Sequence, residues 1–248
     1  MRSLHAELQK AKQRHDLPLM LAVLLVVALW SNAGRPESAD ALAMGYRSLL
    51  HTIPMLNIIL MPPVMAMLAS RLWDIEIKGS APKLLYTLQS RRALFGAKCV
   101  LGLAEVVFVT LGEAVVLVVL GIVDGFTEVL PTALLLDFAV TTLAVNAMLF
   151  LSSLLLTVIC NGPIPALCVS IVGALAGLFA NMVSAQLAKL VPWGYFLQLS
   201  RVQMDWNEAT QQVTYPVGPL NLPLLAVTLG LVTVLLAAAW VLIREQEV

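Results

Sequence analysis

The chain of 248 residues is 60% apolar and only 12% charged, and its mean hydropathy is +0.89. Soluble domains carry about 25% charged and about 45–50% apolar residues, so one soluble core could not hide this much apolar surface, and the sequence predicts an integral membrane protein. Lysines plus arginines equal aspartates plus glutamates at 15 each, which argues against a nucleic-acid partner, because no basic surplus is left to neutralise phosphates.

Six segments are apolar enough to cross a bilayer, for which a helix needs about 20 residues. Their apolar runs are continuous and not alternating, so the predicted fold class is an all-α polytopic membrane protein, here a single domain over residues 1–248. The expected spans cover about residues 17–34, 49–73, 93–123, 130–160, 163–187 and 222–243.

The N-terminal residues 1–16 precede the first span and carry several basic side chains. Leu4, Leu8 and Ala11 share one helical face, which predicts an interfacial helix lying on the membrane surface. A disordered cytosolic tail is the alternative. The first span also has the length of a signal-peptide core, and cleavage after it would leave five spans.

Basic residues are unevenly distributed between the two sides of the predicted membrane. Eleven of the 15 lysines and arginines fall on the side that holds both termini and the connection after the second span. Because cytoplasmic loops carry the excess of lysine and arginine, we expect both termini in the cytoplasm.

The connection between the second and third spans shows a helical pattern. Gly79 and Ser80 read as a turn and a helix N-cap, and Leu84, Leu85 and Leu88 follow as an apolar stripe. This favours a short amphipathic helix across the ends of two spans. The alternative is a basic loop that only orients the protein.

The same connection resembles the loop of type-2 ABC exporter permeases, which reads approximately E-x-x-x-G-T-x-K-x-L-L-x-x-P-x-S-R-x-x-x-x-x-K. The chain departs from it at Ser80 and Ala81, near the usual threonine, and at Gln89, near the usual proline. Motif-like positions are held by Glu76, Gly79, Lys83, Leu84, Leu85, Ser90, Arg91 and Lys98.

Within that family, the length, the six spans and the Pro-Trp segment around Trp193 are similar to the small permeases that protect bacteria from lantibiotics and bacitracin-like peptides. The resemblance implies a multi-pass protein of the bacterial plasma membrane that moves or expels a membrane-associated antimicrobial peptide. It also implies membrane lipid around the chain and a second permease subunit, identical or paralogous.

The resemblance further implies that ATP and Mg are bound by a separate ABC ATPase dimer. The chain has no G-x-x-x-x-G-K-S/T motif, so we expect it to bind no cofactor and to hydrolyse no nucleotide itself. The residues implied to couple the permease to the ATPase are Glu76, Gly79, Lys83, Leu84, Leu85, Leu88 and Arg91.

Polar residues inside the expected spans are candidates for a substrate pathway: Glu105, Glu113, Asp137 and Asn146. An ionisable group at mid-bilayer costs at least about 2.5–3.5 kcal/mol and tends to face the protein interior. These residues could line an acidic route for a cationic peptide or hold a proton. The alternative is an interhelical hydrogen bond from a protonated glutamate.

The long connection before the last span is rich in aromatic residues. Trp193, Tyr195 and Trp206 could form an extracellular lid or re-entrant hairpin, or could belong to an interfacial aromatic belt. Before it, Gly173 and Gly177 have the small-xxx-small spacing of a tight contact, either within the chain or between two copies.

Two other classes of protein remain as alternatives. An intramembrane hydrolase is disfavoured because H-E-x-x-H is absent and the three cysteines lack CxxC spacing, so we expect no metal site. A self-sufficient secondary carrier would show two repeated halves, which this sequence lacks.

Overall fold

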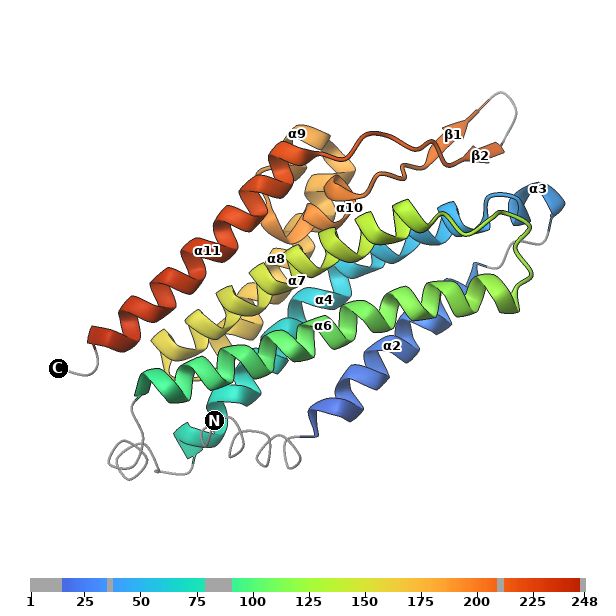
Figure 1. Cartoon of the computed structure of the whole chain (residues 1–248). Helices are drawn as coiled ribbons and strands as arrows, with labels where there is room; N and C mark the ends of the chain where they lie inside the picture. Colours follow the sequence, from blue (N-terminus) through green and yellow to red (C-terminus); the bar gives the residue numbers. More distant parts are fainter. Residues whose placement is uncertain (1–14, 35–37, 79–90, 209–211, 246–248) are drawn as a thin grey trace.

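The computed structural model describes residues 15–34, 38–78, 91–208 and 212–245, which form a bundle of long helices (Figure 1). Six of these helices are long and apolar enough to cross a membrane, which confirms the predicted fold class. They are α2 (Asp16–Ala33), α4 (Gly45–Lys78), α6 (Arg91–Val123), α7 (Thr132–Cys160), α8 (Pro163–Val183) and α11 (Leu222–Glu245).

The fifth span was expected to reach about residue 187, whereas α8 ends at Val183. Ser184 has an extended backbone, and its side chain accepts a hydrogen bond from the backbone N–H of Leu187 at 3.2 Å. This N-cap starts a separate short helix, α9 (Ala185–Ala188). The apolar run continues past the point where the helix breaks.

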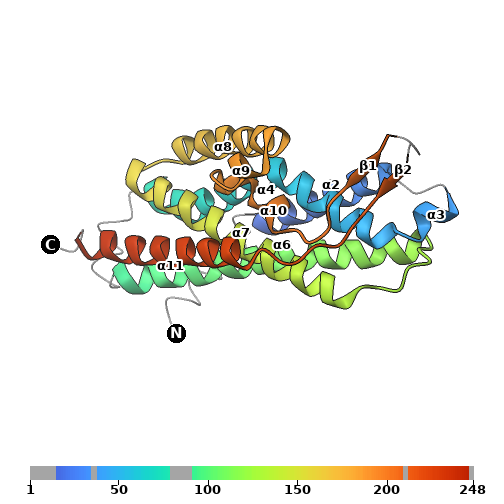
Figure 2. The ribbon, with the colours of Figure 1, turned by 90° about the horizontal axis from the view of Figure 1, so that it is seen from above.

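The two ends of the bundle carry different structures, as both ribbon views show (Figures 1 and 2). The hairpin end holds the short helix α3 (Ala39–Leu42) and the strands β1 (Asp205–Asn207) and β2 (Gln212–Thr214). The terminal end holds the start of α2, the end of α4, the start of α6 and the end of α11.

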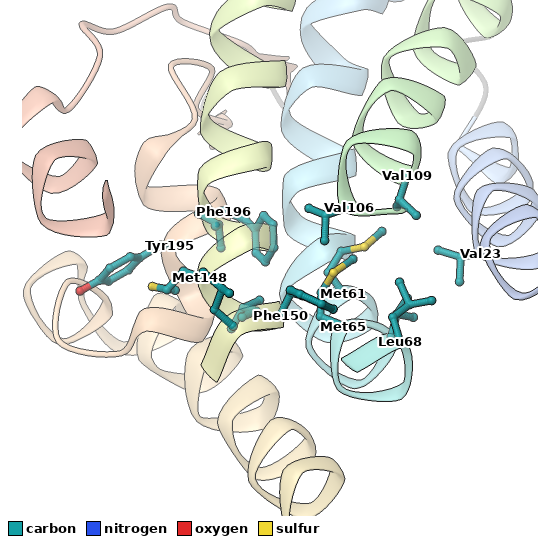
Figure 3. Packing of buried hydrophobic residues seen from close by; sticks show 14 of the residues in the cluster. Val23, Met61, Met65, Leu68, Val106, Val109, Met148, Phe150, Tyr195 and Phe196 are labelled. Atoms are coloured by element: carbon teal, nitrogen blue, oxygen red, sulfur yellow. The ribbon is translucent and has the colours of Figure 1, made fainter. Parts of the chain in front are cut away.

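The central helix is α4, which packs against α2, α6, α7 and α8. Its buried side chains meet those of the neighbouring helices in one apolar core (Figure 3). Ile53, Met61 and Leu68 are fully buried there. Three prolines, Pro54, Pro62 and the adjacent Pro63, lie inside α4, yet the helix continues through them, so neighbouring groups have to satisfy the carbonyls that the prolines leave without a donor.

The segment after α8 folds back along that helix. It contains α9, the 3-10 turn η1 (Pro192–Gly194) and α10 (Tyr195–Leu199). A Cβ atom on Gly173 would lie 2.3 Å from the Trp193 ring, and one on Gly177 would lie 2.7 Å from the Gly194 nitrogen. A turn of the same chain therefore packs against this small-xxx-small pair. Gly173 lies about 15 Å before the end of α8, at 1.5 Å per residue, so the segment returns by about that length along α8. We call residues 184–200 the re-entrant segment.

Candidate functional site

Four polar side chains meet in the middle of the bundle between α4, α6 and α7. Asn57 Nδ2 donates to Glu113 Oε2 at 3.0 Å, and Asn146 Nδ2 donates to Thr110 Oγ1 at 3.2 Å. Thr110 and Glu113 are three residues apart on α6, so they lie on the same face of the helix. All four side chains are buried. We call Asn57, Thr110, Glu113 and Asn146 the polar layer.

The polar layer is a contact between α4, α6 and α7. The structure brings Glu113 and Asn146, two of the expected pathway residues, into this layer, and it places Glu105 on α6 eight residues before Glu113, also buried. Four cavities in the described part of the chain have none of these residues in their walls. The geometry therefore favours interhelical hydrogen bonding over an open acidic route in this conformation.

Asp137, the remaining pathway candidate, lies apart from the polar layer near the start of α7. Its Oδ2 atom accepts from Arg201 Nη1 at 2.6 Å, and Arg201 Nε donates to the backbone oxygen of Gly218 at 3.0 Å. Both side chains of the ion pair are partly exposed. Asp137 thus ties the connection between α8 and α11 to α7.

The three aromatic residues expected in a lid lie in two separate places. Trp193 packs on Gly173 in the re-entrant segment. Tyr195 is buried beside it and its hydroxyl donates to the backbone oxygen of Lys189 at 2.9 Å. Trp206 lies on β1 with half of its surface exposed. Trp193 and Tyr195 therefore anchor the re-entrant segment, and Trp206 is the one of the three that is exposed.

The loop that resembles the exporter motif falls mostly outside the described residues. Glu76 lies near the end of α4 and Arg91 begins α6, but their side chains lie outside the described part. One motif-like residue, Lys98, is described: its Nζ donates to the backbone oxygen of Leu72 and lies 5.9 Å from the Trp73 ring centroid. Lys98 thus links the start of α6 to the last turns of α4. The other predicted coupling residues, which lie outside the described residues, are Gly79, Lys83, Leu84, Leu85 and Leu88.

Comparison with known families decides the class of protein. A family model described as ABC-2 family transporter protein matches residues 3–177, which is well over half of the chain. The chain belongs to the ABC-2 transporter family. No curated protein and no solved structure matches it.

Membership of this family makes the chain the membrane permease of an ABC transporter. An ABC-2 permease is a membrane subunit and not itself an enzyme, and it associates with an ABC ATPase subunit. The family therefore decides against the intramembrane hydrolase and the self-sufficient carrier. The match ends at Gly177, so the re-entrant segment of this permease lies beyond it.

Two residues that hold the re-entrant segment of the permease were missed from the sequence. Asn181 on α8 donates to the backbone oxygen of Gly194 at 3.2 Å and accepts from Gln198 Nε2 at 2.8 Å. Ser200 Oγ lies 3.2 Å from the backbone oxygen of Leu50 and 3.2 Å from that of Val202, and its one hydrogen is shared between these two acceptors. Leu50 lies four residues before Pro54, whose ring nitrogen cannot donate to it. Ser200 thus replaces a hydrogen bond that the proline removed.

The substitution Ser200→Ala in the permease is expected to lower the free energy of unfolding by about 1–2 kcal/mol, because the Leu50 carbonyl loses its donor inside the protein. The loss should shrink in a Pro54→Ala background, where residue 54 regains an N–H four residues after Leu50. This coupling is measured by denaturant titration, in mixed micelles, of the unaltered permease, the two single variants and the double variant Pro54→Ala/Ser200→Ala. Ser152→Ala is the control, since Ser152 bonds within its own helix to Leu149. If Ser200→Ala lowers the free energy of unfolding equally with and without Pro54→Ala, Ser200 does not replace the hydrogen bond that Pro54 removes.

Proposed function

We propose that this permease works in the bacterial plasma membrane as part of an ATP-driven exporter that moves or expels a membrane-associated antimicrobial peptide. An ATPase dimer binds ATP and Mg and docks at the terminal end, and a second permease, identical or paralogous, completes the complex. The observation that carries the proposal is the ABC-2 family match over residues 3–177. The resemblance of the loop around Glu76 to the exporter motif supports the docking site.

The distribution of charge supports an orientation with both termini in the cytoplasm. At the hairpin end lie Asp40 on α3, Asp205 on β1, Glu208 directly after β1, and Glu128, which pairs with Arg47. Residues 1–14, which precede α2, and residues 71–98 together hold ten of the 15 lysines and arginines, and the start of α2, the end of α4 and the start of α6 lie at the opposite end. Since lysine and arginine stay on the cytoplasmic side, the hairpin end faces outward.

An apolar cavity beside the re-entrant segment supports a membrane-associated substrate. Its volume is about 480 Å³, and Val172, Ala176, Leu190 and Trp193 are among its lining residues. Val172 and Leu190 are largely exposed, so the cavity opens toward the lipid side of α8. An amphipathic peptide at the membrane surface has an apolar face that fits such a site, while its charges meet the acidic hairpin end.

The double variant Glu76→Ala/Leu84→Asp is expected to abolish transport while the protein is still expressed, because it removes a charge and an apolar contact from the proposed docking loop. Co-purification with the ATPase measures docking directly. The matched control is Glu208→Ala/Val129→Asp, which makes the same changes at the hairpin end and should leave capture of the ATPase unchanged. If Glu76→Ala/Leu84→Asp captures as much ATPase as the unaltered permease, the docking site is elsewhere.

The peptide substrate is tested separately. Cells that lose this permease should become more sensitive to lantibiotics, and the co-expressed complex should hydrolyse ATP faster when a lantibiotic is added. If deletion leaves peptide tolerance unchanged and no peptide stimulates the ATPase, the substrate is of another class, although the family assignment is unaffected.

A further inference from the structure

A second cavity lies at the hairpin end between α3 and β2. Its volume is about 620 Å³, within the range of about 300–1,000 Å³ that is typical of ligand sites. Ser38, Asp40 and Met44 line one side, and Val213 and Tyr215 belong to the other. In both ribbon views β2 lies between β1 and α3 (Figures 1 and 2). The edge of β2 that faces away from β1 therefore faces this cavity.

The register of the hairpin shows which backbone groups point into the cavity. Gln203 N–H donates to Pro216 O at 3.1 Å, and Gly218 N–H donates to Arg201 O at 2.7 Å. These bonds flank the bridge between residues 202 and 217, which is a non-hydrogen-bonded pair. Because the two pair types alternate along an antiparallel ladder, residues 206 and 213 form another such pair.

The N–H and C=O groups of Val213 and of Tyr215, two residues further on, consequently point away from β1. No hydrogen bond from the rest of the described chain reaches these four groups. An open strand edge of this kind is a template for pairing with another extended segment. Asp40, the charged residue of the cavity wall, lies opposite this edge.

The charge around the cavity indicates which kind of partner would bind there. Asp205 and Glu208 on the hairpin are exposed. The two arginines that the structure describes in the neighbouring elements are already engaged: Arg47 Nε lies 2.7 Å from Glu128 Oε1, and Arg201 pairs with Asp137. Among the described residues, the surplus of charge at the cavity is therefore acidic and complements a cationic partner.

We propose that an extended cationic peptide segment binds in this cavity by adding a third strand to the free edge of β2. The proposal rests on the proposed function, since it gives the antimicrobial peptide its first binding site on the outer side. Backbone hydrogen bonds to Val213 and Tyr215 supply affinity that depends little on sequence, and Asp40 favours basic side chains. A second copy of the chain is disfavoured as occupant, because it would bring an equally acidic edge to the same place.

The experiment uses the full permease in nanodiscs of phosphatidylcholine, a lipid without net charge, and a fluorescein-labelled eight-residue peptide of alternating lysine and valine. Of the backbone hydrogen-bonding groups of the hairpin, Val213→Pro removes the outward N–H and none that joins β1 to β2. We expect peptide affinity, measured by fluorescence anisotropy, to fall by about tenfold. Met204→Pro is the matched control, because Met204 lies opposite Tyr215 and its N–H points to the other edge of the hairpin. The affinity of this variant for the peptide should stay within about twofold of that of the unaltered permease.

A second arm uses the unaltered permease, so it is independent of how the proline variants fold. A peptide of the same sequence that is N-methylated at alternate residues keeps its charge but cannot pair along one edge, and it should not bind. Equal binding of the methylated peptide, or equal affinities of Val213→Pro and the unaltered permease, would overturn the proposal. So would the loss of a two-copy assembly in Val213→Pro without peptide, which would assign the edge to a second copy.

Failure of this inference is distinguishable from failure of the proposed function. If Val213→Pro binds peptide normally while deletion of the permease still sensitises cells, the function stands and the strand site is wrong. If the peptide binds at β2 but deletion leaves tolerance unchanged, the site stands and the immunity function is wrong. Capture of the ATPase reports on the terminal end and should be unaffected by Val213→Pro.

Discussion

Replacing Gly177 by alanine is expected to lower the free energy of unfolding by about 1–3 kcal/mol, the usual range for overpacking a tight interior contact. The new Cβ would lie 2.7 Å from the Gly194 nitrogen and 2.9 Å from the Trp193 carbonyl carbon. Both are backbone atoms, so no side-chain rotation relieves the clash. The re-entrant segment has to move away from α8 as a whole. Thermal unfolding of the detergent-solubilised permease measures the loss.

The control for this prediction is Gly230→Ala on α11, where a Cβ would meet nothing within 4 Å. Alanine is favoured over glycine in a helix by up to about 1 kcal/mol, so this variant should be as stable as the unaltered protein or slightly more stable. The two identical substitutions thus have opposite expected signs. If Gly177→Ala unfolds at the same temperature as Gly230→Ala, the turn at Pro192–Gly194 does not rest on α8 as described.

The six long helices could be predicted from the sequence because each depends only on its own run of apolar residues. The end of α8 could not, because residues 185–187 include further apolar side chains and only the conformation of Ser184 marks the break. The spacing of Gly173 and Gly177 predicted a close contact correctly, but not its partner. A glycine pair indicates that another stretch of backbone approaches the helix closely. Which stretch it is depends on the whole fold.

The contacts that hold the re-entrant segment join residues far apart in the chain. Ser200 and Leu50 are separated by 150 positions, and Asp137 and Arg201 by 64. No local pattern links such residues, although Pro54 by itself indicates that the carbonyl of Leu50 needs another donor. Asp137 was grouped with Glu113 because both interrupt apolar runs. The structure separates them because Asp137 lies close enough to the helix end to meet a residue of the connection.

Replacing Glu113 by leucine is expected to lower the free energy of unfolding by about 1–3 kcal/mol, because the buried amide of Asn57 then loses its partner. Glu113→Gln is expected to change it by less than about 1 kcal/mol. Glu113 Oε1 and Asn57 Oδ1 have no hydrogen-bond partner within the described residues. A glutamine at position 113 has the same shape and can donate to Asn57 Oδ1 while its own oxygen accepts from Asn57 Nδ2. Unfolding in mixed micelles compares the two variants.

The double variant Asn57→Leu/Glu113→Leu separates a structural from a chemical role for the polar layer. Replacing both partners by apolar groups of similar size leaves no buried amide unsatisfied, so the double variant should recover most of the stability that Glu113→Leu loses. If the layer only joins α4 to α6, Glu113→Gln should also keep full export of the peptide. Loss of export in Glu113→Gln without loss of stability would contradict this, because it would show that the carboxyl group acts on a substrate or a proton within the membrane.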